Sequence, residues 1–516
     1  ELFSGMYVTD PLANLLKLLA MLFVAVSLLY SRHYLETRGL LKGEYYVLVL
    51  TALLGIFVMI SAGSLLTMYI GVELLALSLY ALVAFDRDNG VAAESAMKYF
   101  VLGAIASGCL LYGMSLVYGL GGSLLFSELA VALQGPASLG LIMGVVFLVV
   151  GVAFKFGAVP FHMWVPDVYH GAPSSVTLFV ATAPKIASFA LAFRLLAGGL
   201  EGISETWTQM LAIVAVLSAL VGNVVAIAQT NLKRMLAYSA VGNVGFILLG
   251  FVAGTEQGYE AALYYTIAYV IMTLGSFGVI LLASRAGFEA DELDHFKGLH
   301  ARDPLLALMM MFLMFSTAGI PPFVGFWAKL QIFEALWTSN HVALVVFAAA
   351  VSVIGVFYYL RVVKIMYFDA PGDLPTTERH AGVQVDVVGE GARGGSVRRD
   401  AAAVDGQDAR AEDAVAAGAD PACIQGQAAV ESVGSGQQDR TRRGLEHRDA
   451  GAREVGEERR GAEGEGGAVF AHEIQRALGR EEGIEGDDAH VQADGAVGDD
   501  GADIAAADNA ERFGSD

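Results

Sequence analysis

Cysteine is almost absent from this sequence of 516 residues, which has only Cys109 and Cys423. An iron–sulfur cluster normally takes four thiolates, so this chain cannot hold one by itself, and it has no framework of disulfides. There is also no Walker loop, no Gly-x-Gly-x-x-Gly motif between a strand and a helix, no Cys/His metal cluster and no histidine pair spaced for haem. These absences predict a chain without a redox cofactor or a metal. Cys109 lies in an apolar run, where we expect a small buried side chain.

Lysine, tyrosine and tryptophan are missing from residues 373–516, which are rich in Ala, Gly, Asp, Glu and Arg. This part carries 15 Arg against 32 Asp and Glu, whereas residues 1–372 carry 17 Lys and Arg against 21 Asp and Glu. We predict a transmembrane domain over residues 1–370 and a low-complexity acidic tail over residues 371–516. The tail composition is typical of disorder. Arginine without lysine, beginning abruptly after a span, favours instead an out-of-frame translation of a GC-rich gene.

Residues 1–370 are built of apolar runs of about 20 residues, the length that crosses ~30 Å of hydrocarbon. In lipid the backbone polar groups must bond within the segment, so these runs predict an all-α polytopic bundle. We expect about eleven spans, near residues 11–31, 45–62, 64–85, 98–118, 137–163, 175–197, 207–228, 235–253, 259–284, 304–336 and 342–360. The chain opens at Glu1 without Met, its first apolar run is a full span, and no signal peptide with a cleavage site precedes it. We therefore expect an N-terminal truncation.

Basic residues gather in the loops that follow the odd-numbered spans. They include Arg38, Arg87, Lys233, Arg302 and Arg361, whereas the loops after even-numbered spans carry almost none. By the positive-inside rule, odd-numbered spans end in the cytoplasm and residue 1 lies outside.

Four charged residues stand out inside the predicted spans, where a Lys or Asp costs about 2.5–3.5 kcal/mol even on a lenient scale. They are Glu73 in LTMYIGVELLALSLYAL, Lys155 in VVGVAFKFGAVPFHMW, Lys185 in VTLFVATAPKIASFALAF and Lys329 in FSTAGIPPFVGFWAKLQIFEAL. We predict that they form a proton relay. The alternatives are a structural carboxylate at Glu73 and a lysine that snorkels to the span end at Lys155.

Prolines interrupt two of these spans beside their lysines. Pro160 follows Lys155, and Pro321 and Pro322 precede Lys329. Proline removes an intrahelical hydrogen bond, so we expect both helices to be broken. Broken helices near the midplane mark transporter binding sites, and a pair of them suggests inverted repeats. Desolvation disfavours the charged form of a buried lysine, which suits a group that must release its proton.

A histidine in the same region is a further candidate. His162 follows Lys155 by seven residues, and on an intact helix the two would share a face. Because histidine titrates near neutrality, we predict that His162 belongs to the relay. We expect His170 to be a plain loop residue and Glu334 to be an interface residue.

The stretch KFGAVPFHMWVPDVYHGAPSSVTLFVATAPKIASF resembles the signature of the antiporter-like subunits of proton-pumping NADH:quinone oxidoreductase, respiratory complex I. It most resembles the subunit N members, because of PDVYxGAP and the spacing from Lys155 to Lys185. The segments GVELLALSLYAL and GIPPFVGFWAKL match the same members, and a lysine at 329 argues against subunit M. The resemblance covers about residues 6–370.

This resemblance implies fourteen helices with two inverted five-helix repeats, each containing one broken helix. Two N-terminal helices and the last helix would then be missing here. It also implies that Glu73 modulates Lys155, that Lys185 connects the hydrophilic axis, that Lys329 faces an aqueous half-channel and that His162 belongs to the axis. Quinone, NADH, FMN and iron–sulfur clusters are expected in other subunits. The expected partners are the neighbouring membrane subunits and the lipid of a bacterial inner membrane, without nucleic acid.

We therefore predict a proton-translocating membrane subunit of NADH:quinone oxidoreductase, coupled to quinone reduction elsewhere in the complex. An Mrp-type cation/proton antiporter or a membrane-bound hydrogenase subunit is the alternative. A membrane scaffold that transports nothing is a third interpretation.

Overall fold

The structure, a computed structural model, describes residues 2–284 and 287–371. Ten helices in this part are long and apolar enough to cross a membrane, and no strand is formed there beyond isolated bridges. The prediction of an all-α transmembrane bundle is confirmed. The predictions about the tail from residue 372 onward lie outside the described residues.

Helices follow one another along the described chain with short connections. Their bounds are α1 Pro11–Thr37, α2 Gly43–Ile60, α3 Leu65–Val83, α4 Gly90–Gly121, α5 Phe126–Ala132, α6 Leu139–Phe156, α7 Trp164–Gly171, α8 Ser174–Ala181, α9 Ala183–Ala192, the π-helix η1 Phe193–Gly199, the 3-10 helix η2 Glu201–Ile203, α10 Ser204–Ile227, α11 Leu232–Val252, α12 Glu256–Ala283, the 3-10 helix η3 Leu293–Phe296, α13 Leu299–Arg302, α14 Pro304–Ala318, α15 Val324–Thr338 and α16 Val342–Phe368.

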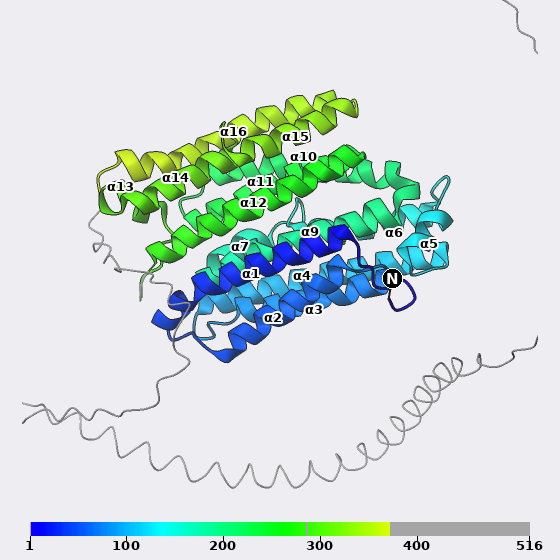
Figure 1. The fold of residues 1–516 in the computed structure, drawn as a ribbon, viewed down its shortest axis with the longest axis horizontal. Coiled ribbons are helices and arrows are strands. Elements are labelled where there is room, and N and C mark those ends of the chain that lie inside the picture. Colours follow the sequence, from blue (N-terminus) through cyan, green and yellow to red (C-terminus); the bar gives the residue numbers. More distant parts are fainter. Residues whose placement is uncertain (1, 285–286, 372–516) are drawn as a thin grey trace, which may run out of the picture. The chain divides into compact units, whose positions relative to one another are not determined.

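The long helices of the bundle run roughly side by side (Figure 1). Helices α1 to α4 lie on one side, α14 to α16 lie on the other, and α7, α9, α11 and α12 lie between them. Helix α11 packs against α10, α12, α7 and α15. Almost all of α11 and of the segment from α8 to η1 is buried, so these central helices form the interior of the bundle.

The first long helix begins at a capped residue. The Asp10 carboxylate accepts a hydrogen bond from the Ala13 amide at 2.7 Å, and it pairs with Arg194 of η1 at 2.6 Å. Burial raises the pKa of Asp10, but the Arg194 side chain and the Ala13 amide outweigh it and hold the pKa below its usual value. The cap therefore also ties α1 to the π-helical turn.

Two helices are broken at the positions that the prolines predict. Helix α6 ends at Phe156, Gly157 adopts φ +74°, and α7 begins at Trp164. Helix α14 ends at Ala318, Gly319 adopts φ +86°, and α15 begins at Val324. Glycine takes this left-handed conformation at little cost, which makes it the usual residue after a helix end. The two broken helices are present as predicted, while an inverted relation between the halves stays a prediction.

A third break is not among our predictions. The span expected over residues 175–197 is divided, because α8 ends at Ala181, Thr182 adopts φ −114° and ψ −92°, and α9 begins at Ala183. Pro184 lies in the first turn of α9, where a missing backbone donor is tolerated. The interpretation of His170 as a loop residue is wrong, because His170 lies in the last turn of α7.

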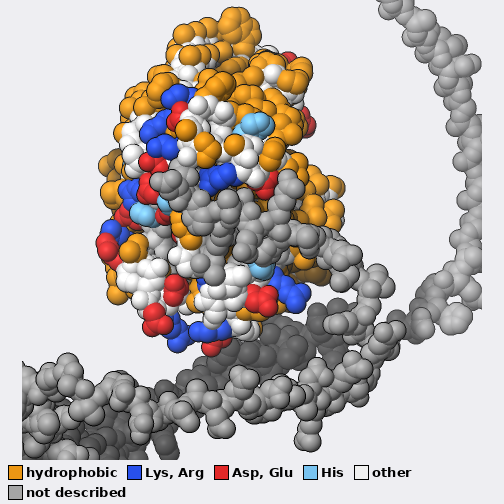
Figure 2. All heavy atoms as spheres, turned by 90° about the vertical axis from the view of Figure 1, so that its left-hand side faces the viewer, with side chains coloured by type: hydrophobic (Ala, Val, Ile, Leu, Met, Phe, Trp, Pro, Cys, Tyr) orange, Lys and Arg blue, Asp and Glu red, His pale blue; other side chains and the backbone are white. Residues whose placement is uncertain are grey.

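Charged side chains gather at one end of the bundle, where α1 and α16 end (Figure 2). Asp167 of α7 accepts from Lys98 of α4 at 3.1 Å and from Arg234 of α11 at 3.0 Å. Arg38 pairs with Glu289 at 2.6 Å beside them. In this view apolar side chains border the charged end. We call this surface the charged end; it is the end that the loop charges predict to face the cytoplasm.

Candidate proton-relay site

The Lys155 side chain of α6 reaches the part of α3 that carries Glu73. The Lys155 ammonium donates to the Val72 carbonyl at 3.4 Å and interacts electrostatically with Glu73. Oε1 of Glu73 is buried and has no hydrogen-bond partner among the described residues. Both residues are half-buried in the chain by itself. The pair can therefore change its charge state without breaking a short hydrogen bond between the two side chains.

Lys185 is fully enclosed by the protein, with 2% of its surface exposed. Its ammonium donates to the carbonyl of Phe156 at 2.6 Å, and Phe156 is the last residue of α6. Because a helix leaves its last carbonyls without intrahelical donors, this end offers both an acceptor and a partial negative charge. Ser188 of α9 donates to the Lys155 carbonyl at 3.2 Å. The break in α6 therefore brings Lys185 to the segment that carries Lys155.

Lys329 lies in an arrangement that repeats this geometry. Its ammonium donates at 2.8 Å to the carbonyl of Ala318, the last residue of α14, and at 3.0 Å to the Ser352 hydroxyl of α16. The same ammonium lies 5.2 Å from the ring centroid of Phe246 on α11. Each broken helix thus offers its terminal carbonyl to one buried lysine. No sequence signal points to Ser352, since serine inside an apolar helix is common.

Both of these lysines lack a carboxylate partner among the described residues. Their hydrogen bonds go to the carbonyls of Phe156 and Ala318 and to the hydroxyl of Ser352. When a lysine in an ion pair loses its proton, it leaves an uncompensated buried anion, which is strongly unfavourable. Lys185 and Lys329 avoid that penalty. Their environment is therefore suited to exchanging protons rather than to holding a fixed charge.

His162 lies in the non-helical segment between α6 and α7. His162 does not share a helix face with Lys155, because α6 ends at Phe156, before His162 is reached, as the predicted break implies. Its ring lies 6.4 Å from the ring of Tyr238 on α11, and its Nδ1 is buried without a hydrogen-bond partner in the described part of the chain. A relay role for His162 stays a prediction.

Lys233 is a buried cation that the sequence does not reveal. In the sequence, Lys233 is one of the basic loop residues that indicate the orientation of the spans. In the structure, it is the second residue of α11 and its side chain is 2% exposed. Its ammonium donates to the Ala172 carbonyl at 3.1 Å and lies 3.8 Å from Glu289. Lys233 lies at the start of a span, where a lysine usually extends its ammonium to the membrane surface. The sequence alone therefore gives no sign that Lys233 is buried.

The lysines of the two halves are not in direct contact. No hydrogen bond or ion pair between described residues joins Lys185 to Lys329. Helix α11 contacts the helices that carry the two lysines. Its Phe251 packs against Phe189 of α9 with ring centroids 5.5 Å apart, and its Phe246 lies beside Lys329. A proton that moves between the halves must therefore pass side chains of α11 or water beside them.

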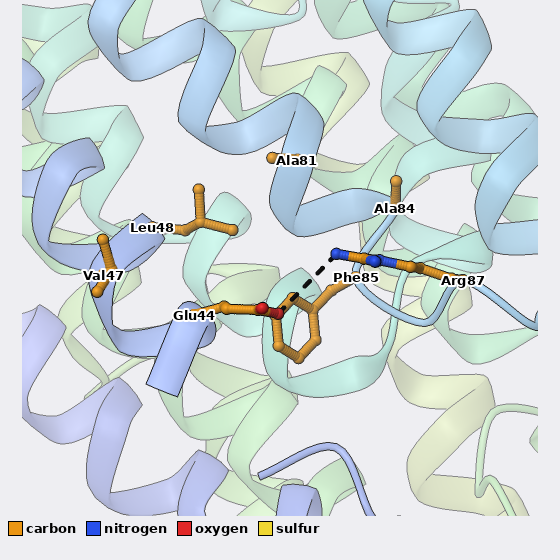
Figure 3. Close-up of a pocket in the computed structure, with 7 residues that line it drawn as sticks. All are labelled: Glu44, Val47, Leu48, Ala81, Ala84, Phe85 and Arg87. Carbon is orange, nitrogen blue, oxygen red and sulfur yellow. Dashed lines mark ion pairs between the residues drawn. The ribbon is translucent and has the colours of Figure 1, made fainter. Parts of the chain in front are cut away.

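A surface hollow lies apart from these groups, between the start of α2 and the end of α3 (Figure 3). Glu44 and Arg87 face each other there at 3.9 Å, and both side chains are mostly exposed. Exposed ion pairs contribute little, typically about 0–1 kcal/mol. The other residues that line the hollow are Val47, Leu48, Ala81, Ala84 and Phe85. None of the predicted relay residues reaches it, so the candidate site lies among the helices.

Metal-ligating residues are not grouped in the described ranges: no set of three or more His, Cys, Asp or Glu there could hold a metal ion. Cys109 is free and half-buried, whereas the sequence predicts a small buried side chain there. It lies on α4, whose outward positions are exposed in the chain by itself.

Comparison with known proteins places the chain among respiratory membrane proteins. Residues 62–355 match the family described as "NADH:quinone oxidoreductase/Mrp antiporter, TM". NADH-quinone oxidoreductase subunit N of Thiobacillus denitrificans is 59% identical over 372 residues, which cover 72% of this chain and 77% of that protein. The subunit of the same name from Nitrosomonas europaea is 55% identical over 371 residues, with the same coverage of 72% and 77%.

Solved structures of three respiratory or antiporter complexes contain similar chains. A chain of respiratory complex I from Thermus thermophilus with bound aureothin has a TM-score of 0.61 and 34% identity, over 72% of this chain and 80% of that one. A chain of the archaeal membrane-bound sulfane sulfur reductase has a TM-score of 0.63 and 30% identity, over 70% and 75%. A chain of the Mrp complex from Dietzia has a TM-score of 0.64 and 25% identity, over 72% and 68%.

Proposed function

This chain belongs to the NADH:quinone oxidoreductase/Mrp antiporter family of transmembrane proteins, within its subunit N group, and we propose that it translocates protons for a bacterial NADH:quinone oxidoreductase. It is a multi-pass protein of the inner membrane, and its partners are the other membrane subunits of the complex. The observation that carries the proposal is the pair of buried lysines, Lys185 and Lys329, each held by the last carbonyl of a broken helix.

The proposed mechanism is an electrostatic relay. Quinone reduction in other subunits shifts charge near Glu73, and the change is felt at Lys155, since low dielectric strengthens the coupling between neighbouring charges. Lys155 then passes its proton towards Lys185, whose acceptor carbonyl belongs to the next residue after Lys155. Lys329 receives a proton in the second half and releases it outside. His162, in the segment between α6 and α7 and with its ring 6.4 Å from that of Tyr238 of α11, takes part in this transfer.

We also propose that the chain holds no redox cofactor of its own and that NADH oxidation and quinone reduction take place in other subunits. The support is chemical: two cysteines in 516 residues do not supply the four thiolates of an iron–sulfur cluster. The chain thus contributes to an enzyme as its proton-carrying part.

The identities favour this proposal over an Mrp-type antiporter. The relatives named subunit N are 55% and 59% identical to this chain, against 25% for the chain of the Mrp complex. The test is purification of the chain from its native membrane by an affinity tag. We expect it to bring down peripheral NADH-oxidising subunits. Recovery with small antiporter subunits and without NADH dehydrogenase activity would overturn the proposal.

Replacing Gly319 tests whether the broken end of α14 positions Lys329. A Cβ at Gly319 would lie 2.9 Å from Cδ of Lys329 and 3.2 Å from its ammonium, so Gly319→Ala is expected to displace the lysine. We expect most of the NADH-driven proton transport of the complex to be lost, as measured by a pH-sensitive dye in membrane vesicles.

Gly254→Ala is the matched control for this change. Gly254 also has a positive φ, +64°, but a Cβ there would meet only the Val252 carbonyl at 3.9 Å. The control carries the same kind of backbone strain without touching Lys329, and we expect it to keep its transport. Equal losses in the two variants would mean that strain alone explains the effect.

A further inference from the structure

An uncharged polar cluster lies in the interior between α11, α12 and α16, and we call it the tyrosine cluster. It consists of Ser239 and Asn243 of α11, Tyr265 of α12 and Tyr359 of α16, none of them more than 4% exposed. The Tyr265 hydroxyl donates to Oδ1 of Asn243 at 2.8 Å, and Nδ2 of Asn243 donates to the Tyr359 hydroxyl at 3.2 Å. The Tyr359 and Ser239 hydroxyls are hydrogen-bonded to each other. The relay described above makes no use of these groups.

One aromatic ring, that of Phe246, lies close to both the tyrosine cluster and Lys329. The Phe246 ring is parallel to the Tyr265 ring, with an interplanar angle of 5° and centroids 5.9 Å apart. The Lys329 ammonium lies 5.2 Å from the Phe246 centroid. Phe246 is itself 2% exposed. The tyrosine cluster and the Lys329 ammonium thus adjoin the same apolar side chain.

The cluster extends from Phe246 towards the charged end of the bundle. On α11, Ser239 precedes Phe246 by seven residues. On α16, Tyr359 follows Ser352, which accepts a hydrogen bond from Lys329, by seven residues. Seven residues of helix rise by about 10 Å. Helix α11 begins and α16 ends at the charged end, so the cluster covers part of the distance from that end to Lys329.

We propose that the tyrosine cluster is an uptake route that brings protons from the charged end to Lys329, and that the Phe246 ring closes it at rest. This inference rests on the proposed function. A hydroxyl that accepts a proton passes its own proton to the next acceptor, so each group recovers its neutral form. Asn243 orients the two tyrosine hydroxyls and carries no proton itself, so a water molecule beside it takes the proton from the Tyr359 hydroxyl and passes one to the Tyr265 hydroxyl. When the Phe246 ring moves, a water molecule transfers the proton to the Lys329 amine, which becomes the ammonium.

The rival explanation is that the cluster only holds the helices together, since polar side chains often bond across helices in membranes. The two explanations predict different proton flow after the same two substitutions. If the cluster is only structural, removing the Tyr359 hydroxyl and removing the Phe246 ring should both weaken the protein. If it is a gated route, the first change should block proton flow and the second should allow it without turnover.

The test uses the intact complex in proteoliposomes. Tyr359→Phe removes one hydroxyl with little change of shape and is expected to lose most of the NADH-driven proton transport. The matched control is Tyr45→Phe, because Tyr45 of α2 is equally buried and its hydroxyl donates to Ser31 of α1 at 3.2 Å and not to the cluster. We expect this control to keep its transport. Full transport in Tyr359→Phe would overturn the proposal.

The second arm measures passive leakage in the absence of NADH. Phe246→Ala is expected to make an imposed pH gradient decay faster than in the native complex, whereas Phe251→Ala, a buried ring further along the same helix, should leave the decay unchanged. Phe246→Leu replaces Phe246→Ala if the latter does not assemble, and the same leak is expected. A leak in neither Phe246 variant, or an equal leak in Phe251→Ala, would overturn the gate.

These results are distinguishable from a failure of the proposed function. If Lys155→Ala keeps full transport, the proton-relay function itself is wrong. If Lys155→Ala loses transport while Tyr359→Phe keeps it, only the uptake route is wrong.

Discussion

Lys155→Ala in the intact complex is expected to reduce NADH-driven proton transport to background and to slow the coupled reduction of quinone. The reason is that the Lys155 ammonium interacts with Glu73 and that its neighbour Phe156 provides the acceptor for Lys185, so the change interrupts the first half of the relay. Loss of a positioned proton-transfer group typically costs about 10²-fold or more in rate. Glu73→Ala is expected to act in the same direction. Dye-quenching and quinone-reduction rates in membrane vesicles measure both effects.

Lys42→Ala is the control for these variants, because Lys42 is an exposed lysine just before α2. It removes the same positive charge from the chain without touching the interior, and its transport should equal that of the native complex. Unchanged pumping in both Lys155→Ala and Glu73→Ala would refute the assigned roles.

Lys185→Ala is expected to have an equally large effect, for two separable reasons. It removes a proton carrier, and it leaves the Phe156 carbonyl buried without its donor, which costs about 1–3 kcal/mol in stability. Lys185→Gln separates these effects, since an amide can still donate to the carbonyl but cannot carry the proton of an ammonium. We expect both variants to lose proton transport, and the glutamine variant to assemble at the native level.

The outcome for Lys185→Gln decides between transport and structure. If glutamine restores proton transport, Lys185 is needed only to satisfy the end of α6. Immunoblots of the purified complex give the assembly level, so that a loss of transport is compared at equal amounts of complex.

The helical bundle can be predicted from sequence because a chain that crosses lipid can adopt few backbone conformations. Apolar runs of about 20 residues must become helices, and the prolines at 160, 321 and 322 predict the breaks in two of them. The break at Thr182 is not among our predictions, although Pro184 lies inside the expected span over residues 175–197 and removes an intrahelical hydrogen bond there as Pro160 does. The burial of Lys233 is hidden, since a charge at a span end normally reaches water.

Only part of the candidate site can be identified from the sequence. Charged residues inside apolar runs are conspicuous, so Glu73, Lys155, Lys185 and Lys329 can be identified from the sequence alone. The groups that hold the lysines cannot, because a backbone carbonyl has no sequence signature and becomes an acceptor only where a helix ends. The tyrosine cluster escapes prediction for a related reason: Ser, Asn and Tyr are tolerated in spans, and only packing reveals that four of them meet.

The central claim is that the charges buried in this subunit carry protons rather than stabilise a scaffold. The most direct test combines Glu73→Gln, Lys155→Gln, Lys185→Gln and Lys329→Gln in the intact complex and records proton uptake and quinone reduction together in proteoliposomes. A relay predicts that proton uptake disappears and that coupled quinone reduction slows, although the complex assembles. Native rates of both processes in a subunit with none of the four charges would contradict it.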